Sequence, residues 1–325
     1  MRLWRCSLPV GLALGVAACS ESTIPQRAQA PGVAEMQGRE EPATFRFWAP
    51  AGTQFVWTQR RKFDAMLVGT DIADHDQSEL RWVVSMRPSS SEPTVVDMRL
   101  VGVSYVHDGH IMVSGETDAL VQLAIDSEGT LQSVSGADEA ARAVRALATP
   151  EAQPIVDRMF SAAALSTLVR TRTQVMLEDV VGRPTYEGAT WIVPQRSAGN
   201  ALFTRYTVEG ARACDAGPGG ETTACKQLHV WVDVQPRAAE ALARSLVERY
   251  AREKDEQVAP LPQWSGGYHL WGTLLVQPAT LMPAGAELRE AGHFSMASGE
   301  KRYDVDLRAV TDDTFVYGTR NVAQR

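Results

Sequence analysis

Apolar and polar positions alternate, at least in part, along many segments of the chain that are rich in aromatic and β-branched residues. This pattern predicts β-strands, and turn residues such as Asp108-Gly109 and Ser127-Glu128-Gly129 separate several of them. Because the connections are too short for parallel crossovers, we expect an antiparallel meander. The predicted strands are residues 44–60, 63–72, 79–88, 94–106, 111–114, 119–126, 130–134, 190–193, 201–209, 226–235, 267–277, 285–297, 301–310 and 314–318.

Helical periodicity interrupts the strands twice. Residues 137–148 are rich in alanine, and residues 151–176 place apolar side chains near one face at a 3.6-residue period. A second helix is predicted at 236–253, where Pro236 suits the first turn. The chain is therefore expected to be α+β: a single β-rich domain over 43–325 with helical insertions near 137–180 and 236–253. A large antiparallel sheet, an unclosed half-barrel with the helices on one face, fits this order.

Two predicted strands are apolar on both faces. In 94–106, strict alternation places Val101, Val103 and Tyr105 on one face and Met98 and Leu100 on the other. The run 270–276 is similar. Such strands need cover on both sides, which a ligand cavity, a second sheet or a curled edge can provide. The residues expected to border a cavity are Met98, Leu100, Val101, Val103, Tyr105, Leu274 and Val276.

The N-terminus has the layout of a secretory signal, with Arg2 and Arg5 before an apolar run at 8–18. That run is about half the length that crosses a bilayer. Val16-Ala17-Ala18-Cys19 resembles the lipobox of bacterial lipoproteins, which implies cleavage after residue 18 and palmitate or a similar lipid on Cys19 as a membrane anchor. Ser20 follows where inner-membrane retention usually has Asp, which implies the outer membrane. Residues 19–42 have no apolar period and are expected to form a flexible tether.

Removal of residues 1–18 leaves 30 basic and 39 acidic residues, a formal charge of −9. An acidic chain is a poor nucleic-acid partner, because phosphate binding needs a basic surface. Two cysteines remain besides Cys19, namely Cys214 and Cys225, on either side of a Gly/Pro-rich loop. We expect a disulfide between them in an oxidising compartment, because a metal or redox pair would need CxxC spacing or a nearby histidine.

The order of elements across about 43–320 resembles that of the lipoprotein-localisation (LolA/LolB) and LppX-type fold. In that fold an unclosed barrel wraps internal helices and carries acyl chains, so the resemblance implies a lipid ligand. Trp271-Gly272 and the segment 278–283 also resemble uncharacterised envelope lipoproteins. No binding residue can be transferred by position from either group.

Histidines and carboxylates gather around the predicted turn at 107–110, but no third ligand has the spacing of a known metal site. The sequence also lacks the GxSxG, HExxH and phosphate-loop motifs. We therefore expect no catalytic residue, no metal and no cofactor. The leading hypothesis is a non-enzymatic, membrane-anchored lipoprotein of the periplasm or cell surface that binds a lipid or another apolar ligand. The alternatives are an assembly lipoprotein that contacts other envelope proteins, and a hydrolase with an unrecognised site. Protein partners cannot be identified from the sequence.

Overall fold

A computed structural model describes residues 43–318, apart from 51, 88–92, 198–199, 218–219, 235–236, 256–263 and 299–300. The predicted signal peptide, Cys19 and the predicted tether lie outside the described residues. The strands are β1 (Gln54–Leu67), β2 (Ala73–Arg87), β3 (Thr94–His107), β4 (His110–Ile125), β5 (Leu131–Ser135), β6 (Thr190–Ser197), β7 (Asn200–Cys214), β8 (Thr223–Val234), β9 (Trp264–Val276), β10 (Pro283–Ser298) and β11 (Lys301–Tyr317).

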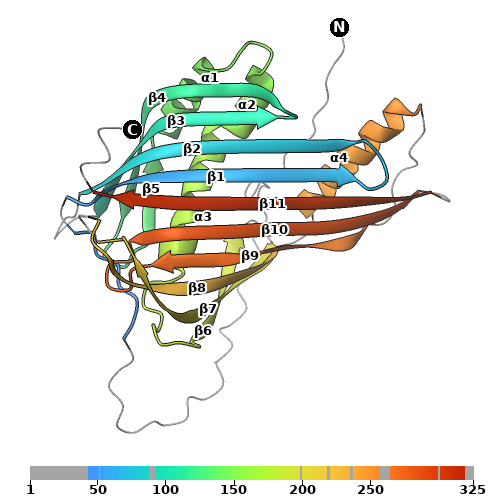
Figure 1. Cartoon of the computed structure of the whole chain (residues 1–325). Coiled ribbons are helices and arrows are strands. Elements are labelled where there is room, and N and C mark those ends of the chain that lie inside the picture. Colours follow the sequence, from blue (N-terminus) through green and yellow to red (C-terminus); the bar gives the residue numbers. More distant parts are fainter. Residues whose placement is uncertain are drawn as a thin grey trace, which may run out of the picture.

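All these strands belong to one antiparallel sheet in the order β5-β4-β3-β2-β1-β11-β10-β9-β8-β7-β6. The first and last of the described strands, β1 and β11, pair with each other at the centre of the sheet (Figure 1). β5 and β6 are the two edges of the sheet and do not pair with each other in the described residues. The predicted α+β class, with an unclosed antiparallel sheet, is confirmed.

Several strands are longer than predicted. β1 continues through Arg61 and Lys62, β4 joins two predicted strands, and β11 continues through Asp312 and Asp313. Polar residues fall at inward positions in two of these strands, Arg61 in β1 and Asp313 in β11. The structure accommodates them by pairing: Asp313 lies opposite Gln59 and accepts a hydrogen bond from its amide at 3.1 Å.

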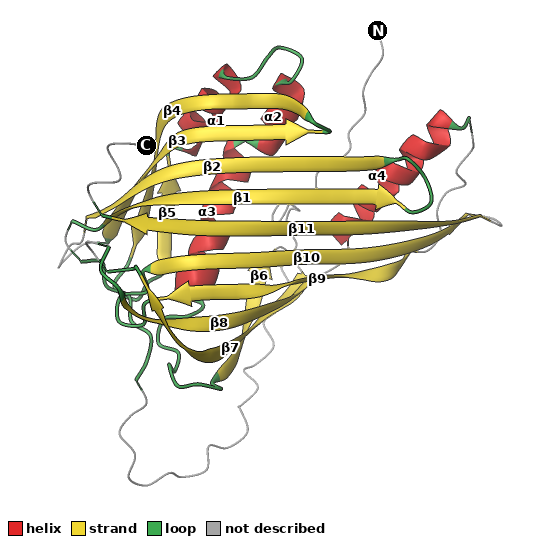
Figure 2. Cartoon of the chain, viewed as in Figure 1, coloured by secondary structure: helices red, strands yellow, loops and turns green. Residues whose placement is uncertain are grey.

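The helices gather on one face of the sheet (Figure 2), as predicted. They are α1 (Ala137–Ala146), α2 (Gln153–Met159), α3 (Ala162–Thr173), the π-helical turn η1 (Gln174–Glu178) and α4 (Arg237–Glu253). Residues two apart in β1 point to the same face of the sheet. Some of them pack in the cluster around α3 and others in the cluster around α4, so both helices lie on this concave face. Phe55 and Trp57 belong to the apolar cluster around α1–α3, and Phe63, Ala65 and Leu67 to a separate cluster around α4.

One prediction about β3 was wrong. Strict alternation placed Met98 and Leu100 on the face opposite Val103 and Tyr105, but all four are buried in the cluster around α1–α3. The pairing register shifts between Leu100 and Gly102, and a β-bulge of this kind inserts one residue and reverses the alternation beyond it. Within the described ranges, helices therefore cover this strand on one face.

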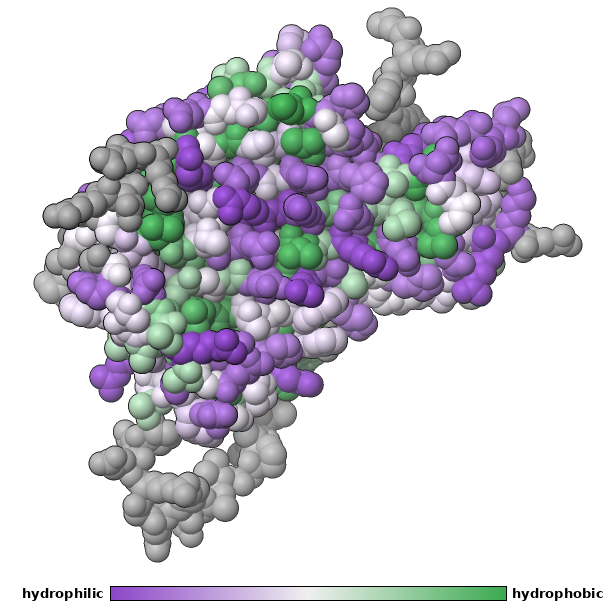
Figure 3. Space-filling model, in the orientation of Figure 1, coloured by the Kyte–Doolittle hydropathy of each residue, from purple (hydrophilic) through white to green (hydrophobic). Residues whose placement is uncertain are grey.

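The opposite, convex face mixes polar areas with scattered apolar ones (Figure 3). At the centre of the sheet its residues include Arg60, Lys62 and Asp64 of β1, all exposed. None of the helices in the described ranges combines the length and the apolar character needed to span a bilayer. The predicted disulfide is present and joins Cys214 at the end of β7 to Cys225 in β8.

Candidate functional site

A cavity of about 100 Å³ separates the end of α3 from the concave face of the sheet. We call it the α3 cavity. Its lining consists of Phe47, Phe55, Trp57, Val84, Met86, Val96, Met98, Leu123, Ile125, Val169, Arg172, Thr173, Met176, Leu177, Leu281, Met282, Pro283 and Phe315.

The sheet wall of the cavity follows from the two-residue period of strands. Each of the neighbouring strands β1, β2, β3 and β4 contributes two residues at positions i and i+2, which point to the same face. These pairs are Phe55 and Trp57, Val84 and Met86, Val96 and Met98, and Leu123 and Ile125. Every one of these side chains is apolar apart from the indole N–H of Trp57, which donates a hydrogen bond to Asp313 at 2.9 Å.

The helical wall follows from a helical period that passes into η1. Val169, Arg172, Thr173 and Met176 lie three or four residues apart and so share one side of the helix. In η1 the wider π-helical turn also brings Leu177 to the lining. Thr173 does not present a free hydroxyl donor to the cavity, because this group donates to the carbonyl oxygen of Val169 at 2.9 Å.

η1 is fixed to both edges of the unclosed sheet. Glu178 accepts a hydrogen bond at 2.6 Å from the backbone N–H of Leu131 in β5. On the other side, the carbonyl oxygen of Asp179 accepts from the indole of Trp191 in β6 at 2.9 Å, and its carboxylate accepts from Tyr206 in β7 at 2.9 Å. Glu178 and Asp179, two consecutive residues after α3, thus connect β5 at one edge of the sheet to β6 and β7 at the other. These contacts hold the helical wall of the cavity in place.

One ion pair borders the α3 cavity. The Nε atom of Arg172 lies 3.5 Å from Oδ2 of Asp313, and the exposed fractions of the two side chains are 14% and 0%. The Oδ1 atom of Asp313 accepts hydrogen bonds from Trp57 and Gln59, whereas its buried Oδ2 has no hydrogen-bond partner among the residues that the structure describes. A charged pair therefore lies at the edge of an otherwise apolar space.

Of the residues predicted to border a cavity, Met98 does so. Leu100, Val103, Leu274 and Val276 are buried in the same apolar cluster without lining the space. Tyr105 is buried against the ring of Phe160 in the segment after α2. Val101 is half-buried at the bulge of β3.

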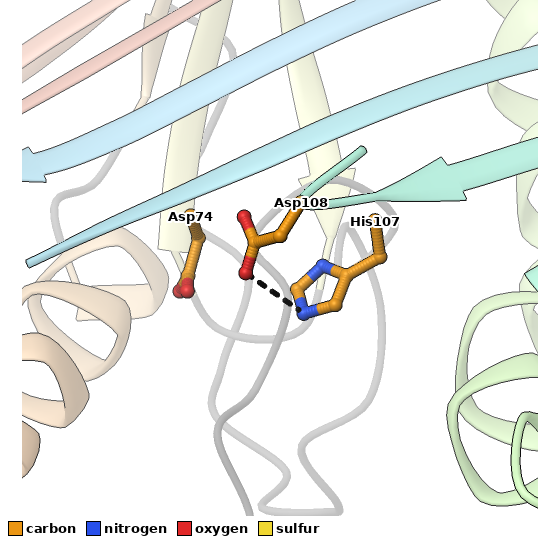
Figure 4. A group of neighbouring side chains, drawn as sticks. All are labelled: Asp74, His107 and Asp108. Carbon is orange, nitrogen blue, oxygen red and sulfur yellow. Dashed lines mark ion pairs between the residues drawn. The ribbon is translucent and has the colours of Figure 1, made fainter. Parts of the chain in front are cut away.

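A second candidate site lies near the other end of β3, where Asp74, His107 and Asp108 approach one another (Figure 4). Nε2 of His107 lies 3.5 Å from Oδ2 of Asp108. The Nδ1 atom of His107 lies 2.8 Å from Oδ1 of Asp76. The same carboxylate oxygen accepts a hydrogen bond from the Tyr105 hydroxyl at 2.8 Å. The hydrogen bond to Asp76 raises the pKa of His107 above its ordinary value.

The donor set of this cluster, two carboxylates and an imidazole, is of a kind that binds zinc. The sequence had suggested no third ligand here, whereas the folded chain brings three residues together. However, Asp74 already pairs with Arg249 of α4, whose guanidinium donates to the carboxylate at 2.6 Å and to the carbonyl oxygen of Ala73 at 2.8 Å. The contacts of the cluster thus suit an ion-pair network that attaches α4 to β2.

This network predicts a pH-dependent contribution to stability. The pKa of His107 is higher in the folded chain than the value of about 6.5 expected in the unfolded chain. The contribution of His107 to the free energy of unfolding is therefore complete at pH values below about 6.5, and it is lost as the pH rises through the folded-state pKa. We expect His107→Gln to lower the free energy of unfolding by about 1 kcal/mol at acidic pH, and by less at alkaline pH. Urea titrations of both proteins across this range measure the difference.

The matched control is His75→Gln, because His75 contacts Asp64 at 2.6 Å with both side chains more than half exposed. An exposed pair of this kind contributes little, so the control should change stability by less than about 0.5 kcal/mol. If His107→Gln lowers the free energy of unfolding by the same amount at acidic and at alkaline pH, the result would contradict a stabilising role of protonated His107.

Sequence reasoning missed Arg172 and Asp313. Arg172 lies in the run Arg170-Thr171-Arg172-Thr173, which is typical of a solvent-exposed helix face. Asp313 follows Asp312 in the gap between the predicted strands 301–310 and 314–318. The two residues come together only in the folded chain, where α3 lies next to β11. The helical period at Val169 and Met176 was the one signal that the helix had an apolar side here.

No protein-family model matches the chain, and the search of curated proteins found no match. Among solved structures, lipovitellin, studied for its lipid–protein interactions, is similar with 9% identity and a TM-score of 0.44 over 82% of this chain. The chain spans 25% of the lipovitellin chain. An outer membrane channel from Pseudomonas putida F1 has 8% identity and a TM-score of 0.22, over 85% of this chain and 100% of the channel. At these scores neither comparison carries an argument about function.

Proposed function

We propose that this chain is a non-enzymatic lipoprotein of the bacterial outer membrane that binds a lipid or another apolar ligand in the α3 cavity. The observation that carries the proposal is the cavity itself, whose lining in the described part of the chain is apolar apart from Arg172 and Thr173. The space is partly open to the surface, and an apolar space of this order of size takes up small apolar molecules. Transfer of an apolar group from water into such a space contributes about 25 cal/mol per Å² of buried surface.

The cavity can adapt to a ligand larger than its present volume. Met86, Met98, Met176 and Met282 line it, four of the ten methionines of the chain. Methionine is unbranched and polarizable, so its side chain adopts new rotamers at little cost and is frequent at surfaces that accept varied ligands. We infer that these four side chains move aside to admit one hydrocarbon chain.

Trp57 provides a direct test, because its side chain lines the α3 cavity. A brominated alkane added to the purified chain should quench tryptophan fluorescence in a saturable way, since bromine quenches an indole in contact with it. The Trp57→Phe variant should lose most of this quenching while it still binds the alkane. Quenching that does not saturate, or that is the same in the variant, would contradict binding in this cavity.

The membrane anchor is the second part of the proposal and rests on the lipobox-like segment Val16-Ala17-Ala18-Cys19. In a Gram-negative host, the mature chain should begin at a lipidated Cys19 and partition into detergent. Cys19→Ala should accumulate as an uncut precursor or as a soluble periplasmic species. A Cys19→Ala protein that is cleaved, carries no lipid and still sediments with outer membranes would contradict the anchor.

A further inference from the structure

Among the described residues that line the α3 cavity, Arg172 is the one that carries a charge. Its position is set by α3, where Val169 on the preceding turn and Met176 on the following turn also line the space. The side chain is 14% exposed. A guanidinium so placed is largely removed from water, so it interacts more strongly with a nearby anion than an exposed arginine does.

The pairing of Arg172 with Asp313 leaves hydrogen-bonding capacity on both sides. The N–O separation is 3.5 Å, longer than the roughly 2.7–3.2 Å of an N–H···O hydrogen bond. Asp313 directs its Oδ1 atom to the neutral donors of Trp57 and Gln59, and these hydrogen bonds stabilise its charge independently of Arg172. A guanidinium has five N–H donors in a fork that matches an oxyanion.

We infer that the ligand of the α3 cavity is an amphiphile: its acidic end, a carboxylate or a phosphate, pairs with Arg172, and its hydrocarbon chain occupies the apolar space. This inference rests on the proposed function and specifies its ligand class. The apolar walls alone bind any hydrocarbon of suitable size, whereas the guanidinium adds a charge-assisted hydrogen bond that only an oxyanion can accept. Asp313 positions Arg172 and, through its own charge, weakens the attraction of the site for the anion.

The test compares a brominated long-chain fatty acid with its methyl ester, using quenching of Trp57 in the purified chain. The two probes share one hydrocarbon chain and differ in charge, so the acid should bind about tenfold more tightly than the ester. Arg172→Met should remove this preference and leave ester binding intact. Asp313→Asn should increase the preference for the acid, because the competing negative charge is lost. Arg170→Met, at an exposed position of the same helix, should bind both probes like the wild type.

The outcomes separate the two proposals. Equal affinities for acid and ester in the wild type, or a preference for the acid that persists in Arg172→Met, would overturn the role of Arg172 and leave apolar binding intact. Failure of both probes to quench would overturn the proposed function itself. If Arg172→Met does not fold, as judged by circular dichroism, the Asp313→Asn result decides: a preference that is unchanged or reduced would overturn the inference. A brominated single-chain phosphate monoester then shows whether the site prefers phosphate or carboxylate, either of which fits.

Discussion

Val84→Phe should abolish binding of apolar ligands in the α3 cavity while leaving the chain folded. Val84 is 2% exposed on the concave face of β2 and lines the cavity. A phenyl ring at this position points into the empty space and fills much of it, so the ring gains contacts without displacing well-packed neighbours. Quenching by the brominated alkane should disappear, and the midpoint of urea unfolding should change little.

The control for this variant is Val121→Phe. Val121 is 1% exposed in the same apolar cluster but does not line the cavity. A larger side chain in a close-packed position costs about 1–3 kcal/mol, so this variant should be less stable and still bind the alkane. If both variants lose stability and both bind, the space around Val84 does not hold the ligand.

Gly136→Ala should lower the free energy of unfolding by about 3 kcal/mol. Gly136 separates β5 from α1 and has a φ of 82°, in the left-handed region that disfavours side chains. A Cβ atom here would lie 2.1 Å from the carbonyl oxygen of Leu120 and 3.2 Å from the Cα of Val121. Both contacts involve backbone, so α1 must move away from β4 to relieve them. Urea or thermal unfolding followed by circular dichroism measures the loss.

Gly69→Ala isolates the contribution of the close contact. Gly69 has a φ of 79°, and no heavy atom of the described residues lies within 4 Å of the position that a Cβ would take. This variant therefore has the same backbone strain without the clash, and should lose only about 1 kcal/mol. Equal losses in the two variants would mean that α1 does not pack against β4 as closely as described.

The sheet and its helices could be predicted from the sequence because they depend on local patterns. Alternation within strands, the turn at Asp108-Gly109 and the helical period from residue 151 are readable over short windows. The bulge after Leu100 was not readable, because Val101 and Gly102 continue an apolar run that gives no sign of an inserted residue. That one residue changed which side chains of β3 share a face, and so which candidates could reach a cavity.

The charged edge of the cavity could not be predicted for a different reason. Arg172 and Asp313 are 141 residues apart in the sequence, and each alone is typical of an exposed position. Their relation depends on the pairing of β1 with β11, which brings Asp313 beside Trp57 and Gln59. Long-range strand pairing of this kind leaves no mark within a local window, because neither strand requires the other to complete its own pattern.

Native mass spectrometry of the wild-type chain purified from cell envelopes tests apolar binding most directly. The chain should carry a non-covalent adduct, in addition to any lipid attached to Cys19, with the mass of a lipid that has one hydrocarbon chain. Extraction with organic solvent should remove the adduct and yield an identifiable acidic lipid, and Val84→Phe prepared in the same way should lack it. A wild-type chain without a non-covalent adduct, or an adduct equally abundant in Val84→Phe, would contradict binding in the α3 cavity.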